Sequence, residues 1–141
     1  MNNNILIGSE KHGCLIDNDK GFIRYYELLS LYEKVTGKNK TIELKFDDIK
    51  SIHIDYSVVN GPRFGTTTIT LSINCNDNLS YDFPLFFWQT ERDDFNLFFK
   101  LLLDSQINIE DPYHIIQSIL DNPASIGTIL SEIDKKKKAT L

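Results

Sequence analysis

Hydrophobic and polar residues alternate along most of the segment between residues 13 and 84. A period of two places neighbouring side chains on opposite faces of a β-strand. Each predicted strand therefore has one polar face, which is typical of an antiparallel sheet. The positions expected inside are Ile52, Ile54, Ile69, Leu71 and Ile73, and those expected outside are His53, Asp55, Thr68 and Thr70.

Turn residues separate several of these strands. The group Asn18-Asp19-Lys20-Gly21 stands between two alternating segments and predicts a hairpin. The stretch 29–40 is less regular, and we expect a strand extension around Leu31 and Tyr32 followed by a loop.

The period changes from two to that of a helix after residue 90. Thr90 and Asp93 resemble a capping box, and apolar residues then recur at helical spacing to about Leu103. Leu97 and Leu101 lie on the side opposite to the sheet-packed phenylalanines, so this helix has a second apolar stripe that must be covered.

Two shorter helices are predicted after the main one. Asp111-Pro112 and Asn122-Pro123 each combine an N-cap residue with a proline at the first helical position. We expect these helices to cover the second stripe of the main helix, or to dock on a second copy of the chain as a homodimer. The residues available for either contact are Ile115, Ile119, Ile126, Leu130 and Ile133.

The order of short antiparallel strands followed by one amphipathic helix resembles that of bacterial pleckstrin-homology-like (PH-like) domains. The segments that carry the resemblance are 41–52, where a polar pair turns the chain between two strands, and 83–103, where the last strand leads into the closing helix. The resemblance implies an α+β fold with an antiparallel PH-like β-barrel or curved sheet over residues 1–104. The helices form an extension over 105–134, and a basic tail follows at 135–141.

Composition favours a single domain with one hydrophobic core, because the chain has 141 residues of which 41% are hydrophobic. A formal net charge of −5 disfavours nucleic acid as a partner. The run Lys135 to Lys138 is interpreted as a solvated tail, or as a weak contact to an anionic surface. The first residues lack the pattern of a signal peptide, so we expect a cytoplasmic protein.

No catalytic motif is present in the sequence, and we predict neither an enzyme nor a cofactor or metal site. The histidines are widely spaced, and Cys14 and Cys75 form no CxxC pair. PH-like domains that bind phosphoinositides present a basic cluster near the first hairpin, but here Lys20 and Arg24 are surrounded by acidic residues. Membrane lipid is therefore not an expected ligand.

Two apolar or aromatic segments remain as candidates for partner binding. The loop 60–65 carries Arg63 and Phe64, which are residue types enriched in binding hot spots. The run 83–88 ends in Trp88 and is too apolar to alternate, so part of it fills the core or faces a partner. The full set of candidate partner-binding residues is Arg63, Phe64, Trp88, Leu97 and Leu101.

The sequence therefore predicts a noncatalytic interaction or regulatory module that binds a protein partner. The alternative is a small acidic immunity or antitoxin-type protein, which neutralises a toxin enzyme through complementary charge. These two hypotheses differ in the partner, which the sequence does not identify. A third hypothesis is an enzyme whose site is assembled from dispersed residues that no motif reveals.

Overall fold

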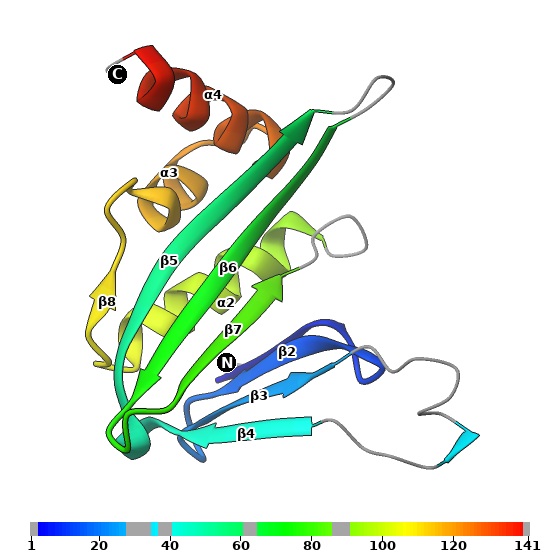
Figure 1. The fold of residues 1–141 in the computed structure, drawn as a ribbon, viewed down its shortest axis with the longest axis vertical. Coiled ribbons are helices and arrows are strands. Elements are labelled where there is room, and N and C mark those ends of the chain that lie inside the picture. The colour runs from blue at the N-terminus through cyan, green and yellow to red at the C-terminus, as the bar shows by residue number, and fades with distance from the viewer. Residues whose placement is uncertain (1–2, 28–34, 37–40, 61–64, 86–90, 140–141) are drawn as a thin grey trace.

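The computed structural model describes residues 3–27, 35–36, 41–60, 65–85 and 91–139, and it has an α+β architecture (Figure 1). Leu31, Tyr32, Arg63, Phe64, Trp88 and Thr90 lie outside the described residues, so the predictions made for them are not tested.

The first sheet is an antiparallel meander in the order β1-β2-β3-β4. Its strands are β1 (Asn4–Ser9), β2 (His12–Asp17), β3 (Phe22–Tyr26) and β4 (Thr41–Lys45). The predicted hairpin between β2 and β3 is confirmed. One Asp17 carboxylate oxygen accepts hydrogen bonds from the backbone N–H groups of Asp19 and Lys20, both at 3.0 Å. Gly21 completes the turn at φ +74°, a conformation that glycine adopts without a Cβ clash.

The second sheet has the order β7-β6-β5-β8. A short 3₁₀ helix, η1 (Phe46–Asp48), separates it from β4, and its strands are β5 (Ile49–Asn60), β6 (Gly65–Cys75), β7 (Ser80–Leu85) and β8 (Ile109–Glu110). The prediction of antiparallel pairing is confirmed for β5, β6 and β7. The two-residue strand β8 instead pairs parallel to β5.

The predicted faces of the second sheet are also confirmed. The five apolar residues expected inside are all fully buried, at 0% exposure: Ile52, Ile54, Ile69, Leu71 and Ile73. Their neighbours His53, Asp55, Thr68 and Thr70 alternate with them on the other face. His53 lies there 3.6 Å from the carboxylate of Glu110 in β8.

The alternative of a closed barrel is wrong for the part of the chain that the structure describes. Among the described residues no strand pairing joins the two sheets; η1 lies between β4 and β5, and α2 (Arg92–Asp104) packs beside β1. The sheets meet instead through side chains. Tyr25 stacks on Phe83 with ring centroids 4.6 Å apart, and its hydroxyl donates to the Pro84 carbonyl at 2.9 Å.

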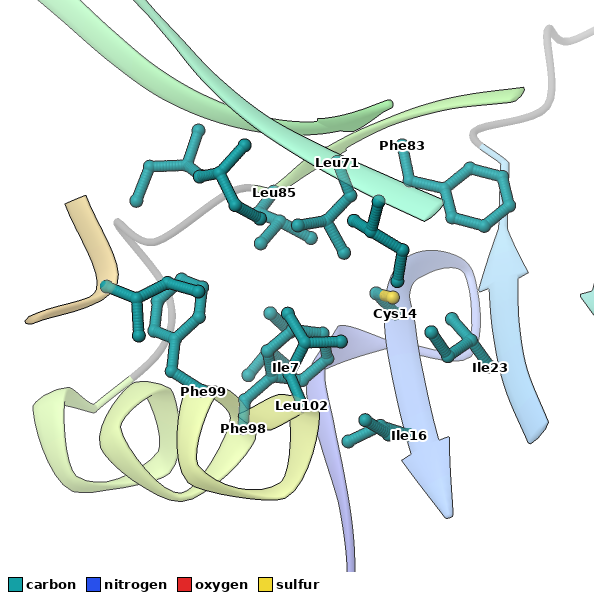
Figure 2. Close-up of a cluster of buried hydrophobic side chains, with 14 of the residues drawn as sticks. Ile7, Cys14, Ile16, Ile23, Leu71, Phe83, Leu85, Phe98, Phe99 and Leu102 are labelled. Atoms are coloured by element: carbon teal, nitrogen blue, oxygen red, sulfur yellow. The ribbon is translucent and has the colours of Figure 1, made fainter. Parts of the chain in front are cut away.

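The core lies where the two sheets and α2 converge (Figure 2). Leu71 and Leu85 project from the second sheet, Ile7 and Ile16 from the first, and Phe98 from the helix. The helical period predicted from the sequence is confirmed, since Phe95, Phe98, Phe99 and Leu102 are all fully buried.

Helix α2 begins at Arg92, and the side chain of its N-cap residue Glu91 makes no capping hydrogen bond. The predicted capping box depends on Thr90, which lies outside the described residues, so that prediction is not tested. The acidic residues Asp93 and Asp94 still occupy the first turn, where the helix dipole favours negative charge.

The two predicted C-terminal helices are present as α3 (Ile115–Asp121) and α4 (Ile126–Ala139). Their apolar residues are buried within this chain: Ile115, Ile116, Ile119, Ile126, Ile129 and Leu130. In α2, Leu101 is 6% exposed and Leu97 is half-buried, so the second stripe is covered by the chain's own packing. Helix α4 continues to Ala139, and the segment predicted as a basic tail is therefore helical over most of its length.

Asp111 caps the start of α3, although this helix begins at Ile115 and not at Pro112 as predicted. Its two carboxylate oxygens accept hydrogen bonds from the N–H groups of Ile115 at 2.9 Å and Ile116 at 2.8 Å. His114, the residue before the helix, has a left-handed backbone with φ 53°.

Replacing Asp111 by alanine is expected to lower the free energy of unfolding by about 1–2 kcal/mol, because two helix N–H groups lose their acceptor. Urea denaturation measures this change. Glu10→Ala, at an exposed turn between β1 and β2, is the control and should change stability by less than about 0.5 kcal/mol. Equal effects of the two substitutions would contradict the capping role.

Candidate functional site

A groove of about 500 Å³ lies between α3 and α4. Its floor contains Ile129 and Ile133 of α4, of which Ile129 is buried and Ile133 half-buried. Polar and charged side chains surround this floor, namely His114, Gln117, Glu132 and Lys136. An apolar floor with a polar rim is the usual composition of a surface that binds another molecule.

The spacing of residues along α4 explains why these side chains share one surface. Ile129, Glu132, Ile133 and Lys136 stand at positions i, i+3, i+4 and i+7, which lie on the same face of a helix. The opposite wall comes from α3, where Gln117 is exposed and donates to the Asp121 carboxylate at 2.8 Å. Helices α3 and α4 therefore line the groove together with His114 before α3 and with Asn122 and Pro123 between the helices.

Arg92 of α2 holds the link between the two helices in place. Its guanidinium donates hydrogen bonds to the backbone carbonyls of Ile119, Asn122 and Ala124. Burial lowers the pKa of this side chain. The carbonyls at the end of a helix lack partners within the helix, and a cation there also interacts favourably with the helix dipole.

The start of α4 is stabilised by local polar contacts. Asn122, the predicted N-cap, accepts a hydrogen bond from the Ala124 N–H at 2.9 Å, but the helix begins only at Ile126. The Ser125 hydroxyl accepts from the Thr128 N–H at 3.2 Å and so acts as the cap. These contacts stabilise the first turn of α4 and the residues that link it to α3.

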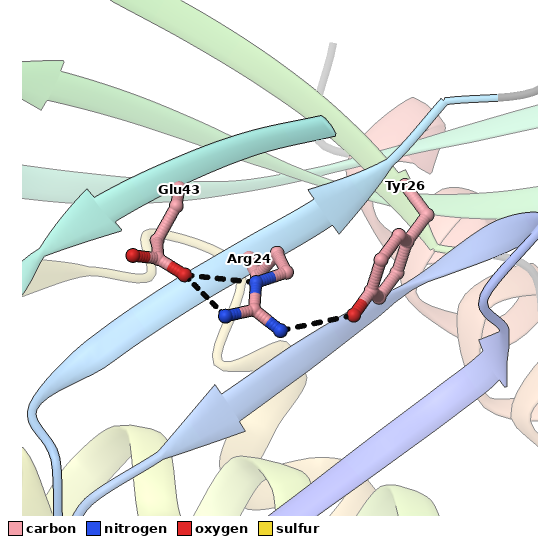
Figure 3. Close-up of polar contacts among 3 residues, drawn as sticks. All are labelled: Arg24, Tyr26 and Glu43. Carbon is pink, nitrogen blue, oxygen red and sulfur yellow. Dashed lines mark hydrogen bonds and ion pairs between the residues drawn. The ribbon is translucent and has the colours of Figure 1, made fainter. Parts of the chain in front are cut away.

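A second polar cluster lies on the outer face of the first sheet (Figure 3). The Arg24 guanidinium donates to the Glu43 carboxylate and, at 3.1 Å, to the Tyr26 hydroxyl. It also lies 4.8 Å from the centroid of the Phe22 ring. The positive charge of Arg24 is thus engaged by groups of the same sheet.

Because Glu43 pairs with Arg24, we predict no micromolar binding to liposomes that contain phosphatidylinositol bisphosphate at physiological salt. Co-sedimentation with such liposomes measures this, with liposomes lacking the phosphoinositide as the reference. Saturable binding that is lost in Lys20→Ala or Arg24→Ala would contradict the prediction.

The thiols and histidines do not form a reactive cluster within the described residues, where no group of three or more metal-ligating side chains is found. Cys14 is buried, and burial raises the pKa of its thiol. Burial also raises the pKa of Cys75, with a further contribution from Asp77. His12 is half-buried near the ring of Tyr25, and desolvation lowers its pKa.

The structure describes two of the five residues that are predicted to bind a partner. Arg63, Phe64 and Trp88 lie outside the described residues. The Leu101 side chain is part of the core, and its backbone carbonyl accepts a hydrogen bond from the Asn18 amide at 2.9 Å. Leu97 is half-buried on the same helix.

The groove residues were not among the predicted site residues. The signal in the sequence was the pattern of Ile129 and Ile133 with Glu132 and Lys136, which mixes apolar and charged positions on one helical face. From the sequence, Ile133 is expected to pack on the main helix or to dock on a second copy of the chain, and Lys136 is expected in a solvated tail.

Comparison with family models, with curated proteins and with solved structures finds no match for this chain. Among the described residues, no helix has both the length and the apolar character needed to cross a membrane.

Proposed function

We propose that the protein is a noncatalytic interaction module of PH-like type that binds a protein partner through the groove between α3 and α4. The order of the elements supports the PH-like part of this proposal. A four-stranded meander is followed by three antiparallel strands and then by a helix over the core. Strand β8 and helices α3 and α4 are additions to that order.

The observation that carries the proposal is the composition of the groove. Its isoleucine floor favours an apolar side chain of the partner, whereas Glu132 and Lys136 at the rim provide one negative and one positive charge. The expected partner segment therefore has an apolar anchor flanked by charged or polar groups. Such central apolar contacts, with a polar rim that excludes water, dominate the affinity of protein interfaces.

A photo-crosslinking amino acid at Gln117 tests this directly. We expect it to capture one defined protein partner in cells, because Gln117 is exposed at the wall of the groove. The matched control carries the crosslinker at Lys50, an exposed residue of β5 that does not line the groove. Ser118→Trp, which fills the groove, should abolish the adduct.

An adduct of equal yield from Lys50, or one that persists in Ser118→Trp, would contradict the assignment of the groove. If the captured protein is a second copy of this chain, the groove is the interface of a homodimer. Sedimentation of the pure protein then gives twice the 16.3 kDa mass of the chain.

An immunity-type protein is the second candidate, and the distribution of charge favours it. Asp47 and Asp48 of η1 lie beside the β6–β7 turn that carries Asp77, since Asn76 donates hydrogen bonds to both of their carbonyls at 2.9 Å. This acidic end is opposite to α4 in the molecule (Figure 1). Complementary charge accelerates the association of an acidic inhibitor with a basic enzyme.

The two candidates differ in how a captured partner responds to mutation. For an immunity-type protein, Asp48→Asn combined with Asp77→Asn should slow association with a basic toxin enzyme, while Ser118→Trp leaves it unchanged. For the groove module the opposite pattern is expected. Stopped-flow association kinetics at low and high salt distinguish the two results.

A further inference from the structure

Two tyrosine rings meet at a right angle beside the C-terminal half of α4. Tyr56 belongs to β5, and Tyr113 lies in the turn before α3. Their ring centroids are 5.1 Å apart, with an interplanar angle of 86°. Both residues are half-buried.

A lysine of the same chain approaches both rings. The Lys137 ammonium lies 5.0 Å from the centroid of Tyr113 and 5.7 Å from that of Tyr56. Both distances fall within the range over which a cation is attracted to an aromatic ring. Hydrogen bonding to Tyr113 raises the pKa of Lys137, which favours its charged form.

Carboxylates complete the surroundings of this ammonium. The Tyr56 hydroxyl donates to Asp134, one turn before Lys137 on α4, at 3.1 Å. Asp55, the neighbour of Tyr56 on β5, also contributes to the raised pKa of Lys137. Two perpendicular aromatic walls with acidic groups beside them are the arrangement by which proteins recognise alkylammonium ions.

We propose that Tyr56, Tyr113 and Asp134 form a binding site for an alkylammonium group from outside the chain, and that Lys137 occupies this site from within. The proposal goes beyond the groove, which is lined by a different face of α4. Lys137 is exposed and stands near the end of the described chain, so its side chain can leave the rings without disturbing the core. The external ligand therefore competes with an internal one.

Removal of the internal competitor should strengthen binding. In Lys137→Ala, choline is expected to bind about two- to fivefold more tightly than in the unchanged protein, as an exposed cation–π contact predicts. Chemical shifts of the Tyr56 and Tyr113 ring protons, followed by NMR during titration with choline, measure the dissociation constants. Sodium chloride at equal ionic strength serves as the reference.

Matched controls make the result specific. Lys135→Ala removes the same charge from an exposed residue of the same helix that does not line the groove, and should leave the affinity for choline unchanged. Tyr113→Phe keeps the aromatic ring and should retain binding, whereas Tyr113→Leu should lose it. The neutral isostere 3,3-dimethylbutan-1-ol should produce no saturable shift.

A short peptide containing trimethyllysine distinguishes the source of the ammonium. Tighter binding of the peptide than of choline indicates a modified lysine side chain of a protein, and equal binding indicates a site that reads the ammonium alone. The absence of a saturable shift with choline in Lys137→Ala overturns the proposal, as does equal binding of the neutral isostere.

Discussion

Replacement of Phe98 by alanine is expected to lower the free energy of unfolding by about 3–5 kcal/mol. Phe98 is fully buried in α2 where both sheets converge, and its ring packs against Phe99 with centroids 5.7 Å apart and an interplanar angle of 87°. Loss of the ring removes apolar burial and leaves a cavity that such a constrained site closes only in part. Urea denaturation followed by circular dichroism measures the loss.

Leu103→Ala is the matched control, because Leu103 is in the same helix but is 45% exposed. Its effect should stay below about 1 kcal/mol, since little apolar area is lost there. A similar loss of stability for both variants would show that the helix, rather than the core contact, determines the result.

The second large loss of stability is expected on substitution of Arg92. Replacement by methionine should destabilise the protein by about 2–3 kcal/mol, because a hydrogen bond from a charged donor contributes this much and the abandoned carbonyls remain unsatisfied. The loss should be concentrated in α3 and α4, whose connection Arg92 holds through Ile119, Asn122 and Ala124. Hydrogen exchange of individual amides in these helices measures it.

Lys100→Met in the same helix is the control, since Lys100 is exposed and the charge change is identical. It should leave the exchange of α3 and α4 unchanged. Uniform destabilisation of the whole chain by Arg92→Met, with no preference for these two helices, would contradict the role assigned to the guanidinium.

Local patterns predicted most of the secondary structure. Alternation identified the strands around Ile54 and Leu71, and the spacing of Phe95, Phe98 and Phe99 identified α2. These patterns are reliable because burial on one face of a strand or helix directly imposes the period. Strand β1 was not identified, since its apolar residues Ile5 to Ile7 form a short continuous run without a period.

Features that depend on distant parts of the chain could not be predicted. Strand β8 has only two residues and exists through parallel pairing with Ile52 and His53. Three of the partners of Arg92 are backbone carbonyls, which leave no signature in the identity of the residues that carry them. The continuation of α4 through the lysines was missed because a run of like charges indicates a solvated segment, whereas here Lys137 contacts Tyr56 and Tyr113.

The position of α2 beside β1 has a consequence for how the chain folds during synthesis. Every pairing within the two antiparallel meanders joins strands that are neighbours in sequence, so these hairpins form early. Strand β1, in contrast, packs beside α2, and the hydrogen bond from Asn18 to Leu101 spans 83 residues. Ile7 and Ile16 therefore remain exposed to water until α2 leaves the ribosome, and closure of this long loop is the step expected to limit the folding rate.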